Sequence, residues 1–205
     1  MKSTKHHEYV SIGTQSATNR IILLHGWGAD ADDLLPLANQ IIKDSDLDFE
    51  IISLRAPNIN LENNCRQWYG LFPAKWDETK REVEKLKLTL EEFGKNRIPL
   101  QNTILFGFSQ GAAMAIDAGI ELDLGLLVAC SGYAHPDWSP PKHIPRVLLS
   151  HGLKDEVVPV VKSREIYQKL RLVSDSNAEL IEFTGNHEID ISVVKEIQKK
   201  IKLLF

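Results

Sequence analysis

The sequence predicts an α/β fold with one mostly parallel β-sheet and helices on both of its faces. Three observations predict this fold. Short continuous apolar runs of strand length recur along the chain, and such runs are typical of strands buried on both faces. Segments with apolar residues at helical spacing separate these runs, as they do in parallel sheets. One run also leads directly into Gly107-Phe-Ser-Gln-Gly111, where strand, tight turn and helix follow one another.

Length and composition are those of one globular domain. The chain has 205 residues, of which 43% are hydrophobic and 25% are charged. It contains no internal repeat, low-complexity tract or linker, so we expect residues 1–205 to form a single domain. The formal net charge of −4 and the lack of a basic face argue against a nucleic-acid partner.

The sequence also predicts a location and the state of its cysteines. No apolar run approaches the roughly 20 residues of a membrane-spanning helix, and residues 1–8 lack the apolar segment of a signal peptide. We therefore expect a cytoplasmic protein with no integral membrane association. Cys65 and Cys130 do not form a disulfide framework and are expected to be free thiols, with Cys130 buried. Whether the protein is a monomer or a homodimer is left open.

The positions of the apolar residues predict each element in turn. Strands are expected at residues 9–12, at the edge of the sheet, and at 20–24, 49–54, 103–106, 124–130, 146–150 and 178–183. Helices are expected at 34–42, 78–93 and 161–172, after the serine turn, and from about residue 189. Acidic residues are expected to fill the first turn of the first helix, with Asp77 capping the second and Gly94 ending it. The long loop 55–76 is expected to be functional.

Ser109 lies at the centre of a Gly-x-Ser-x-Gly pattern, the nucleophile elbow of α/β-hydrolases. A serine between a strand and a helix requires a tight, strained turn, and Gly107 and Gly111 let the backbones pass closely there. The helix that follows directs unpaired N–H groups toward charge that develops beside the serine oxygen. The pattern predicts a nucleophilic serine, although the five residues alone are equally typical of an ordinary turn.

A serine nucleophile requires a base and a carboxylate that orients the base. In α/β-hydrolases the acid and the histidine follow the serine in that order, on loops at the carboxyl edge of the sheet. Asp155 follows one expected strand and His187 follows the last, so they are the expected acid and base. The alternatives are that Glu156 is the acid and that Asp155 only caps the next helix.

Four other histidines compete for the role of base: His25, His135, His143 and His151. His25 and His151 precede the expected order or lie beside the acid, and their expected role is structural hydrogen bonding at strand ends. His135 and His143 lie in a proline-rich loop with no carboxylate at metal-ligand spacing, so no metal site is expected.

Seven short motifs follow one another along the chain: Leu24-His-Gly-Trp-Gly-Ala-Asp30, Arg55-Ala-Pro57, Trp68-Tyr69, Gly107–Met114, Cys130-Ser-Gly-Tyr133, His151–Pro159 and His187-Glu-Ile189. As a set they resemble the phospholipase/carboxylesterase family of small α/β-hydrolases, which includes the acyl-protein thioesterases. The resemblance implies Ser109 as nucleophile, Asp155 as acid and His187 as base. It also implies an oxyanion hole formed by the backbone N–H groups of Trp27 and Gln110.

Family members of this length have no lid domain, which implies an open acyl groove. The candidate lining residues are Trp27, Trp68, Tyr69, Leu71 and Phe72. Such aromatics are equally typical of ordinary packing. The sequence departs from the family at Trp27, where leucine is common, at Gly70, where aspartate is usual, and at Asn186, where glycine is usual. These departures concern substrate choice rather than reaction type.

The resulting hypothesis is a serine carboxylesterase. It would hydrolyse short-to-medium acyl esters through a Ser-His-Asp triad and an acyl-enzyme, with a small-molecule ester or acylated compound as substrate and without a cofactor. One alternative is an acyl-protein thioesterase or lysophospholipase acting on long acyl chains. A catalytically silent binding module with the hydrolase fold is the alternative from another class.

Overall fold

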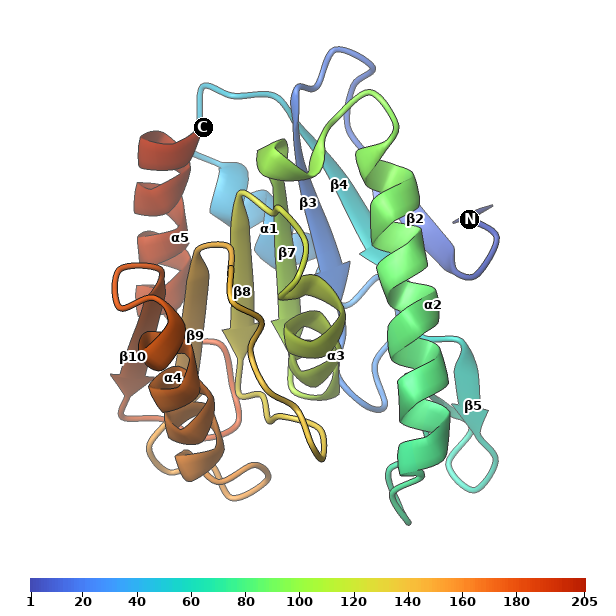
Figure 1. Cartoon of the computed structure of the whole chain (residues 1–205). Coiled ribbons are helices and arrows are strands. Elements are labelled where there is room, and N and C mark those ends of the chain that lie inside the picture. The colour runs from blue at the N-terminus through green and yellow to red at the C-terminus, as the bar shows by residue number, and fades with distance from the viewer.

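A computed structural model describes the whole chain, residues 1–205, and its centre is an eight-stranded sheet (Figure 1). The order of strands across the sheet is β1-β2-β4-β3-β7-β8-β9-β10. The strands are β1 (Lys2–Ser3), β2 (Glu8–Ile12), β3 (Asn19–Leu24), β4 (Phe49–Leu54), β7 (Thr103–Phe108), β8 (Leu126–Cys130), β9 (Val147–Gly152) and β10 (Ala178–Phe183). The β1–β2 and β2–β4 pairs are antiparallel and all the others are parallel. The expected mostly parallel sheet is confirmed.

Helices cover both faces of this sheet (Figure 1). They are α1 (Leu35–Ile42), α2 (Trp76–Gly94), α3 (Gln110–Gly119), α4 (Val161–Val173) and α5 (Ile191–Leu204). α1 and α5 share one apolar core with Ile21 and Leu23 of β3, whereas α2, α3 and α4 share the other with Ile22 and Leu24. Successive side chains of a strand point to opposite faces, so one strand supplies both cores. This explains why the strands are continuous apolar runs.

None of these helices combines the length and the apolar character that crossing a membrane requires.

The starts of α1 and α2 differ from the expectation. α1 has no acidic residue in its first turn. The acidic residues lie in the preceding turn, where Asp30 Oδ2 accepts a hydrogen bond from Arg55 Nη2 at 2.7 Å. Asp77 does not cap α2, because Lys75 occupies the N-cap position and Asp77 lies inside the first turn. A carboxylate is still favoured there by the helix dipole. Neither α1 nor α2 therefore begins with a side-chain cap.

The long loop 55–76 contains a hairpin that the apolar pattern did not indicate. It consists of β5 (Asn58–Asn60) and β6 (Cys65–Gln67), which pair antiparallel. A short 3₁₀ turn, Leu100–Asn102, also precedes β7. Cys65 and Cys130 are free thiols, and Cys130 is buried, as expected. Burial raises the pKa of the Cys130 thiol to about 12, so this thiol stays protonated.

Backbones approach one another closely where β7 turns into α3. A Cβ atom on Gly107 would lie 2.3 Å from the carbonyl oxygen of Gly111. A Cβ atom on Gly111 would lie 2.2 Å from the carbonyl oxygen of Leu24, at the end of β3. Both distances are far inside van der Waals contact. Between the two glycines, Ser109 adopts a φ of 54°, which non-glycine residues rarely show.

We predict that Gly111→Ala destabilises the protein. Replacing a helical glycine by alanine normally stabilises by about 0.5–1 kcal/mol, but here the added methyl group meets backbone that cannot move aside. The expected loss is about 1–3 kcal/mol or more, measured as the free energy of unfolding in urea. The matched control is Gly26→Ala, because the nearest atoms to that Cβ would be 3.4 Å away. Equal losses in the two variants would rule out the close approach as the cause.

Candidate active site

Ser109 is held on both sides of its turn by main-chain hydrogen bonds. Its N–H donates to the carbonyl of Cys130 on β8 at 2.9 Å, and its carbonyl accepts from the N–H groups of Ala112 and Ala113. The strand pair and the first turn of α3 therefore determine the serine backbone together. A strained conformation of this kind persists only where the surrounding structure over-determines it.

His187 lies between Ser109 and Asp155. Its Nε2 is 2.9 Å from Ser109 Oγ and its Nδ1 is 2.7 Å from Asp155 Oδ2. A carboxylate can only accept, so Nδ1 carries the proton and donates to Asp155. The unprotonated Nε2 then faces the serine hydroxyl, as a general base must. The loops after β7, β9 and β10 thus bring the three sequence-predicted residues within hydrogen-bond distance.

The carboxylate of Asp155 is wholly buried, and protein hydrogen-bond donors stabilise its charge. Its Oδ1 accepts from the N–H groups of Val157 and Val158 at 2.9 and 2.8 Å, and its Oδ2 accepts from His187. Burial alone would raise the pKa of Asp155, but the hydrogen bonds from His187 and these N–H groups outweigh it and hold the pKa below its ordinary value. Asp155 does not cap α4, which begins at Val161. Glu156 is exposed and has no hydrogen-bonded partner.

His151 supports the acid from the other side. Its Nε2 is 2.7 Å from the carbonyl oxygen of Val158 and 3.2 Å from Asp155 Oδ2. Both oxygens accept, so Nε2 carries the proton, and Nδ1 accepts from the hydroxyl of Ser163 at 2.6 Å. His151 is fully buried and neither nitrogen is available to substrate. The expectation of a structural role at a strand end agrees with this geometry.

Two backbone N–H groups near the serine have no protein acceptor: Gln110 follows Ser109 in the chain, and Trp27 lines the same hollow as Ser109. Gln110 is the first residue of α3, so its N–H has no acceptor within the helix. The N–H of Trp27 donates to no protein acceptor. The side chain of Gln110 fixes this region, because Oε1 accepts from the N–H of Trp68 at 3.0 Å and Nε2 donates to the carbonyl of Tyr69 at 2.9 Å. Unpaired donors at a helix N-terminus suit a developing oxyanion.

His25 holds the loop that carries Trp27. The N–H of Ala56 donates to His25 Nε2 at 3.1 Å, so Nδ1 carries the proton and donates to the carbonyl of Gly26 at 2.8 Å. Burial lowers the pKa of His25, in agreement with a neutral ring. The carbonyl of Arg66 on β6 also accepts from the N–H of Gly28 at 2.9 Å. The hairpin β5–β6 therefore helps to position the loop that carries Trp27.

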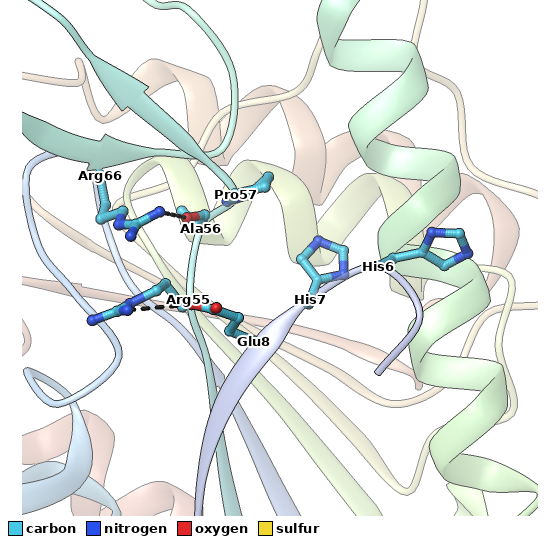
Figure 2. Close-up of a pocket in the computed structure, with 7 residues that line it drawn as sticks. All are labelled: His6, His7, Glu8, Arg55, Ala56, Pro57 and Arg66. Atoms are coloured by element: carbon cyan, nitrogen blue, oxygen red, sulfur yellow. Dashed lines mark hydrogen bonds and ion pairs between the residues drawn. The ribbon is translucent and has the colours of Figure 1, made fainter. Parts of the chain in front are cut away.

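A separate polar hollow of about 260 Å³ is lined by Ala56 and Arg66, the residues that contact His25 and Gly28 (Figure 2). In Figure 2, Arg55 bonds to Glu8 and Arg66 to the carbonyl of Ala56, at 3.2 and 3.5 Å. His7 also lines this hollow, and burial lowers its pKa to about 4, so the ring is neutral. The lining includes no residue of the serine site.

Ser109 and His187 open into a larger, mainly apolar hollow of about 570 Å³. Its other walls are Trp27, Leu71, Phe72, Trp76, Tyr133, Ala134, Pro136, Val157, Val158, Pro159, Lys162 and Glu165. Trp27, Leu71 and Phe72 therefore line the hollow, as we expected from the sequence. Phe72 is 70% exposed and Val157 67% exposed, so water reaches the apolar walls. This arrangement can bind an acyl group without enclosing it.

Trp68 and Tyr69 differ from the expectation, because neither lines this hollow. Both side chains are fully buried in the core beneath it. The indole of Trp68 donates to the carbonyl of His25 at 2.8 Å, and the hydroxyl of Tyr69 is 2.6 Å from that of Tyr133. Aromatic residues with a polar atom are stable in a core when that atom has a partner. Packing, the alternative reading of these aromatics, is the one that the structure supports for this pair.

Sequence reasoning missed several lining residues. Val157, Val158 and Pro159 follow the acid directly, and consecutive apolar residues in a loop at the carboxyl edge of a sheet were a usable signal. Trp76 begins α2 and Tyr133 follows β8. Nothing in the sequence distinguishes these two aromatics from core residues, because their exposure depends on how the loops fold back.

Comparison with known proteins agrees with this geometry. A model of the Phospholipase/Carboxylesterase family matches residues 5–205. The acyl-protein thioesterase 1 homolog 2 of Dictyostelium discoideum is 26% identical over 217 residues, which cover 94% of this chain and 96% of the relative. Acyl-protein thioesterase 1 of Candida albicans is 32% identical over 135 residues, 58% of either chain.

Solved structures are also similar. The structure of esterase PE8 has a TM-score of 0.85 and 27% identity, covering 97% of this chain and 99% of that one. The carboxylesterase of Bacillus cereus, at 20% identity, shares the fold with a TM-score of 0.77 over 98% of this chain and 96% of that one. Because the family model spans nearly all of the sequence, the chain belongs to the phospholipase/carboxylesterase family and is a serine hydrolase of the α/β-hydrolase fold.

Proposed function

We propose that this enzyme is a serine carboxylesterase that hydrolyses short-to-medium acyl esters. The observation that carries the proposal is the hydrogen-bonded series Ser109–His187–Asp155, of which Ser109 and His187 line an apolar hollow. Family membership restricts the chemistry to esters and thioesters but leaves the substrate open. The cytoplasmic location and the oligomeric state stay predictions.

In the proposed mechanism, Ser109 Oγ attacks the ester carbonyl while His187 Nε2 takes its proton. The tetrahedral oxyanion accepts hydrogen bonds from the N–H groups of Trp27 and Gln110, and Asp155 stabilises the imidazolium. His187 then gives its proton to the leaving alcohol, and an acyl-enzyme forms. Water repeats the attack and releases the acid.

The open walls favour short-to-medium acyl groups. Each methylene that a substrate buries contributes about 0.8 kcal/mol, and one left in water contributes nothing. Trp27 lines the hollow, where its ring meets that of Phe72 edge-on at 5.8 Å between centroids, and its Nε1 donates to Gln67 at 3.1 Å. This fixed indole limits the length of chain that the walls can cover.

The second candidate is a thioesterase or lysophospholipase acting on long acyl chains. The names of the matching relatives, acyl-protein thioesterases, favour it, and so does the largely apolar lining of the hollow. The two candidates differ in the acyl length at which kcat/KM is greatest. A series of esters and thioesters from acetyl to palmitoyl distinguishes them.

Ser109→Ala is expected to abolish turnover and leave the fold intact, because it removes a hydroxyl that is not part of the core. Loss of a triad member costs on the order of 10⁴-fold or more in rate. The measurements are ester hydrolysis and labelling by a fluorophosphonate, with the exposed Ser16→Ala as control. Labelling of the wild type but not of the variant excludes a silent binding module. A variant that retains a tenth of the activity would contradict the assignment.

The pH profile of kcat/KM should rise with pH and then level off, because His187 must be neutral to accept the serine proton. The pKa of Asp155 is held below its ordinary value, so this carboxylate is already charged near neutral pH and contributes no second rise. Asp155→Asn should lower kcat on the plateau, since an amide favours the wrong tautomer. The control is Glu156→Gln, and equal damage by it would move the acid by one residue.

Trp27→Leu is expected to shift the optimum toward longer acyl chains. The substitution keeps the backbone N–H, so turnover of short esters should change little. The measurement is kcat/KM against acyl length, with Trp27→Tyr as a control that keeps a bulky ring. An unmoved optimum in Trp27→Leu, or a wild type already fastest on palmitoyl thioesters, would favour the second candidate.

A further inference from the structure

Four polar side chains form a continuous hydrogen-bonded chain that ends in the catalytic hollow. Asp117 Oδ2, on α3, is 2.8 Å from His135 Nδ1, and His135 Nε2 is 3.0 Å from the hydroxyl of Tyr69. The hydroxyl of Tyr69 is 2.6 Å from that of Tyr133, which lines the hollow together with Ser109. The reaction of the triad uses none of the four.

The chemistry of these groups gives the chain a direction. Asp117 only accepts, so His135 donates through Nδ1, and a neutral imidazole then accepts through Nε2. In that neutral state Tyr69 donates to Nε2, and the oxygen of Tyr69 accepts the hydrogen of Tyr133. Burial raises the pKa of both phenols, that of Tyr133 to about 12, so both keep their hydrogens. The hydroxyl of Tyr133 therefore donates its hydrogen to Tyr69, and a lone pair on the Tyr133 oxygen remains able to accept.

Among the mainly apolar walls, Tyr133 carries a hydroxyl whose hydrogen is donated to Tyr69 and whose oxygen can still accept; Trp27, whose N–H donates to Gln67, has no such acceptor. The two charged lining residues, Lys162 and Glu165, are about half exposed, at 47% and 54%, and pair with each other at 3.5 Å. Water reaches both of these charged groups, so they contribute little to the orientation of a bound ligand. A fixed, partly desolvated acceptor discriminates more strongly, because an unsuitable partner leaves it unpaired.

We propose that Tyr133 is a specificity-determining residue whose oxygen accepts a hydrogen bond from a hydroxyl or N–H group of the substrate. The preferred substrates are then esters that carry such a donor near the carbonyl, rather than plain alkyl esters of equal size. Asp117 acts at a distance, as a positioning residue that fixes the direction of the chain. This inference rests on the proposed esterase function and names its substrate class.

The test compares pairs of esters that differ by one group. Ethyl hydroxyacetate and ethyl propanoate place a hydroxyl or a methyl on the acyl side, and 2-hydroxyethyl acetate and propyl acetate place them on the leaving side. Ethyl methoxyacetate and ethyl butanoate form a third pair, in which the ether oxygen can only accept. The readout is the ratio of kcat/KM within each pair. Comparing variants by this ratio removes the intrinsic reactivity of each ester.

Tyr133→Phe keeps the ring and removes the acceptor. In at least one hydroxyl pair, the wild-type ratio should exceed that of Tyr133→Phe by about three- to tenfold, the size of one neutral hydrogen bond. Asp117→Asn should lower the same ratio in part, because an amide can donate as well as accept and so permits both directions of the chain. The control is Tyr167→Phe on α4, whose ring contacts Arg171. It should leave every ratio unchanged.

Three results would overturn the inference. If Tyr133→Phe leaves both hydroxyl ratios unchanged while plain esters are still hydrolysed, the assignment of Tyr133 fails and the esterase function stands. If Tyr133→Phe also loses a preference for ethyl methoxyacetate over ethyl butanoate, Tyr133 donates to substrate. The hydrogen bonds then point in the opposite direction, as they would from a doubly protonated His135. If ethyl propanoate and propyl acetate are not hydrolysed at all, the proposed function fails with it.

Discussion

The serine site depends on one close backbone approach, that of Gly111 to the end of β3. With no side chain, Gly111 lets α3 contact the carbonyl oxygens of Leu24 and His25 directly. This contact holds the N-terminus of α3 against the end of β3, from which the loop that carries Trp27 continues. The turn that carries the nucleophile and the start of the loop that carries Trp27 therefore depend on the same packing constraint. A side chain at position 111 would push α3 away from the end of β3 and so disturb both segments at once.

Three histidines at the carboxyl edge of the sheet show how hydrogen-bond partners, rather than residue type, decide a role. His25 and His151 are fully buried and have partners on both nitrogens that permit one tautomer each. They are neutral connectors. His187 also has a determined tautomer, but its Nε2 faces the hydroxyl of Ser109, which can give up its proton, and its side chain remains 18% exposed. It alone of the three is placed to exchange a proton with substrate.

The sequence predicted the sheet and the position of the site because both follow from burial. Strands covered on both faces are continuous apolar runs, and the loops after parallel strands meet at one edge, which placed Asp155 and His187 near Ser109. The details that it missed depend on tertiary contacts. The hairpin β5–β6 has no apolar alternation, and it is held by pairing that a pattern does not reveal. Trp68 and a true lining residue such as Phe72 are both aromatic, and only the folded loop buries one and exposes the other.

The walls of the hollow differ in how freely they can vary. Phe72 is exposed and has no polar link to the triad, so a change there alters the surface that substrate covers and little else. Val157 and Val158 are different, because their N–H groups donate to Asp155 and any movement of that wall loosens the acid. Tyr69, although buried, ties the loop after β6 to Tyr133 and so shapes the hollow from beneath. Substrate choice in this fold is therefore most easily changed at Trp27, Leu71 and Phe72, since these side chains can be replaced without disturbing the hydrogen bonds that orient His187.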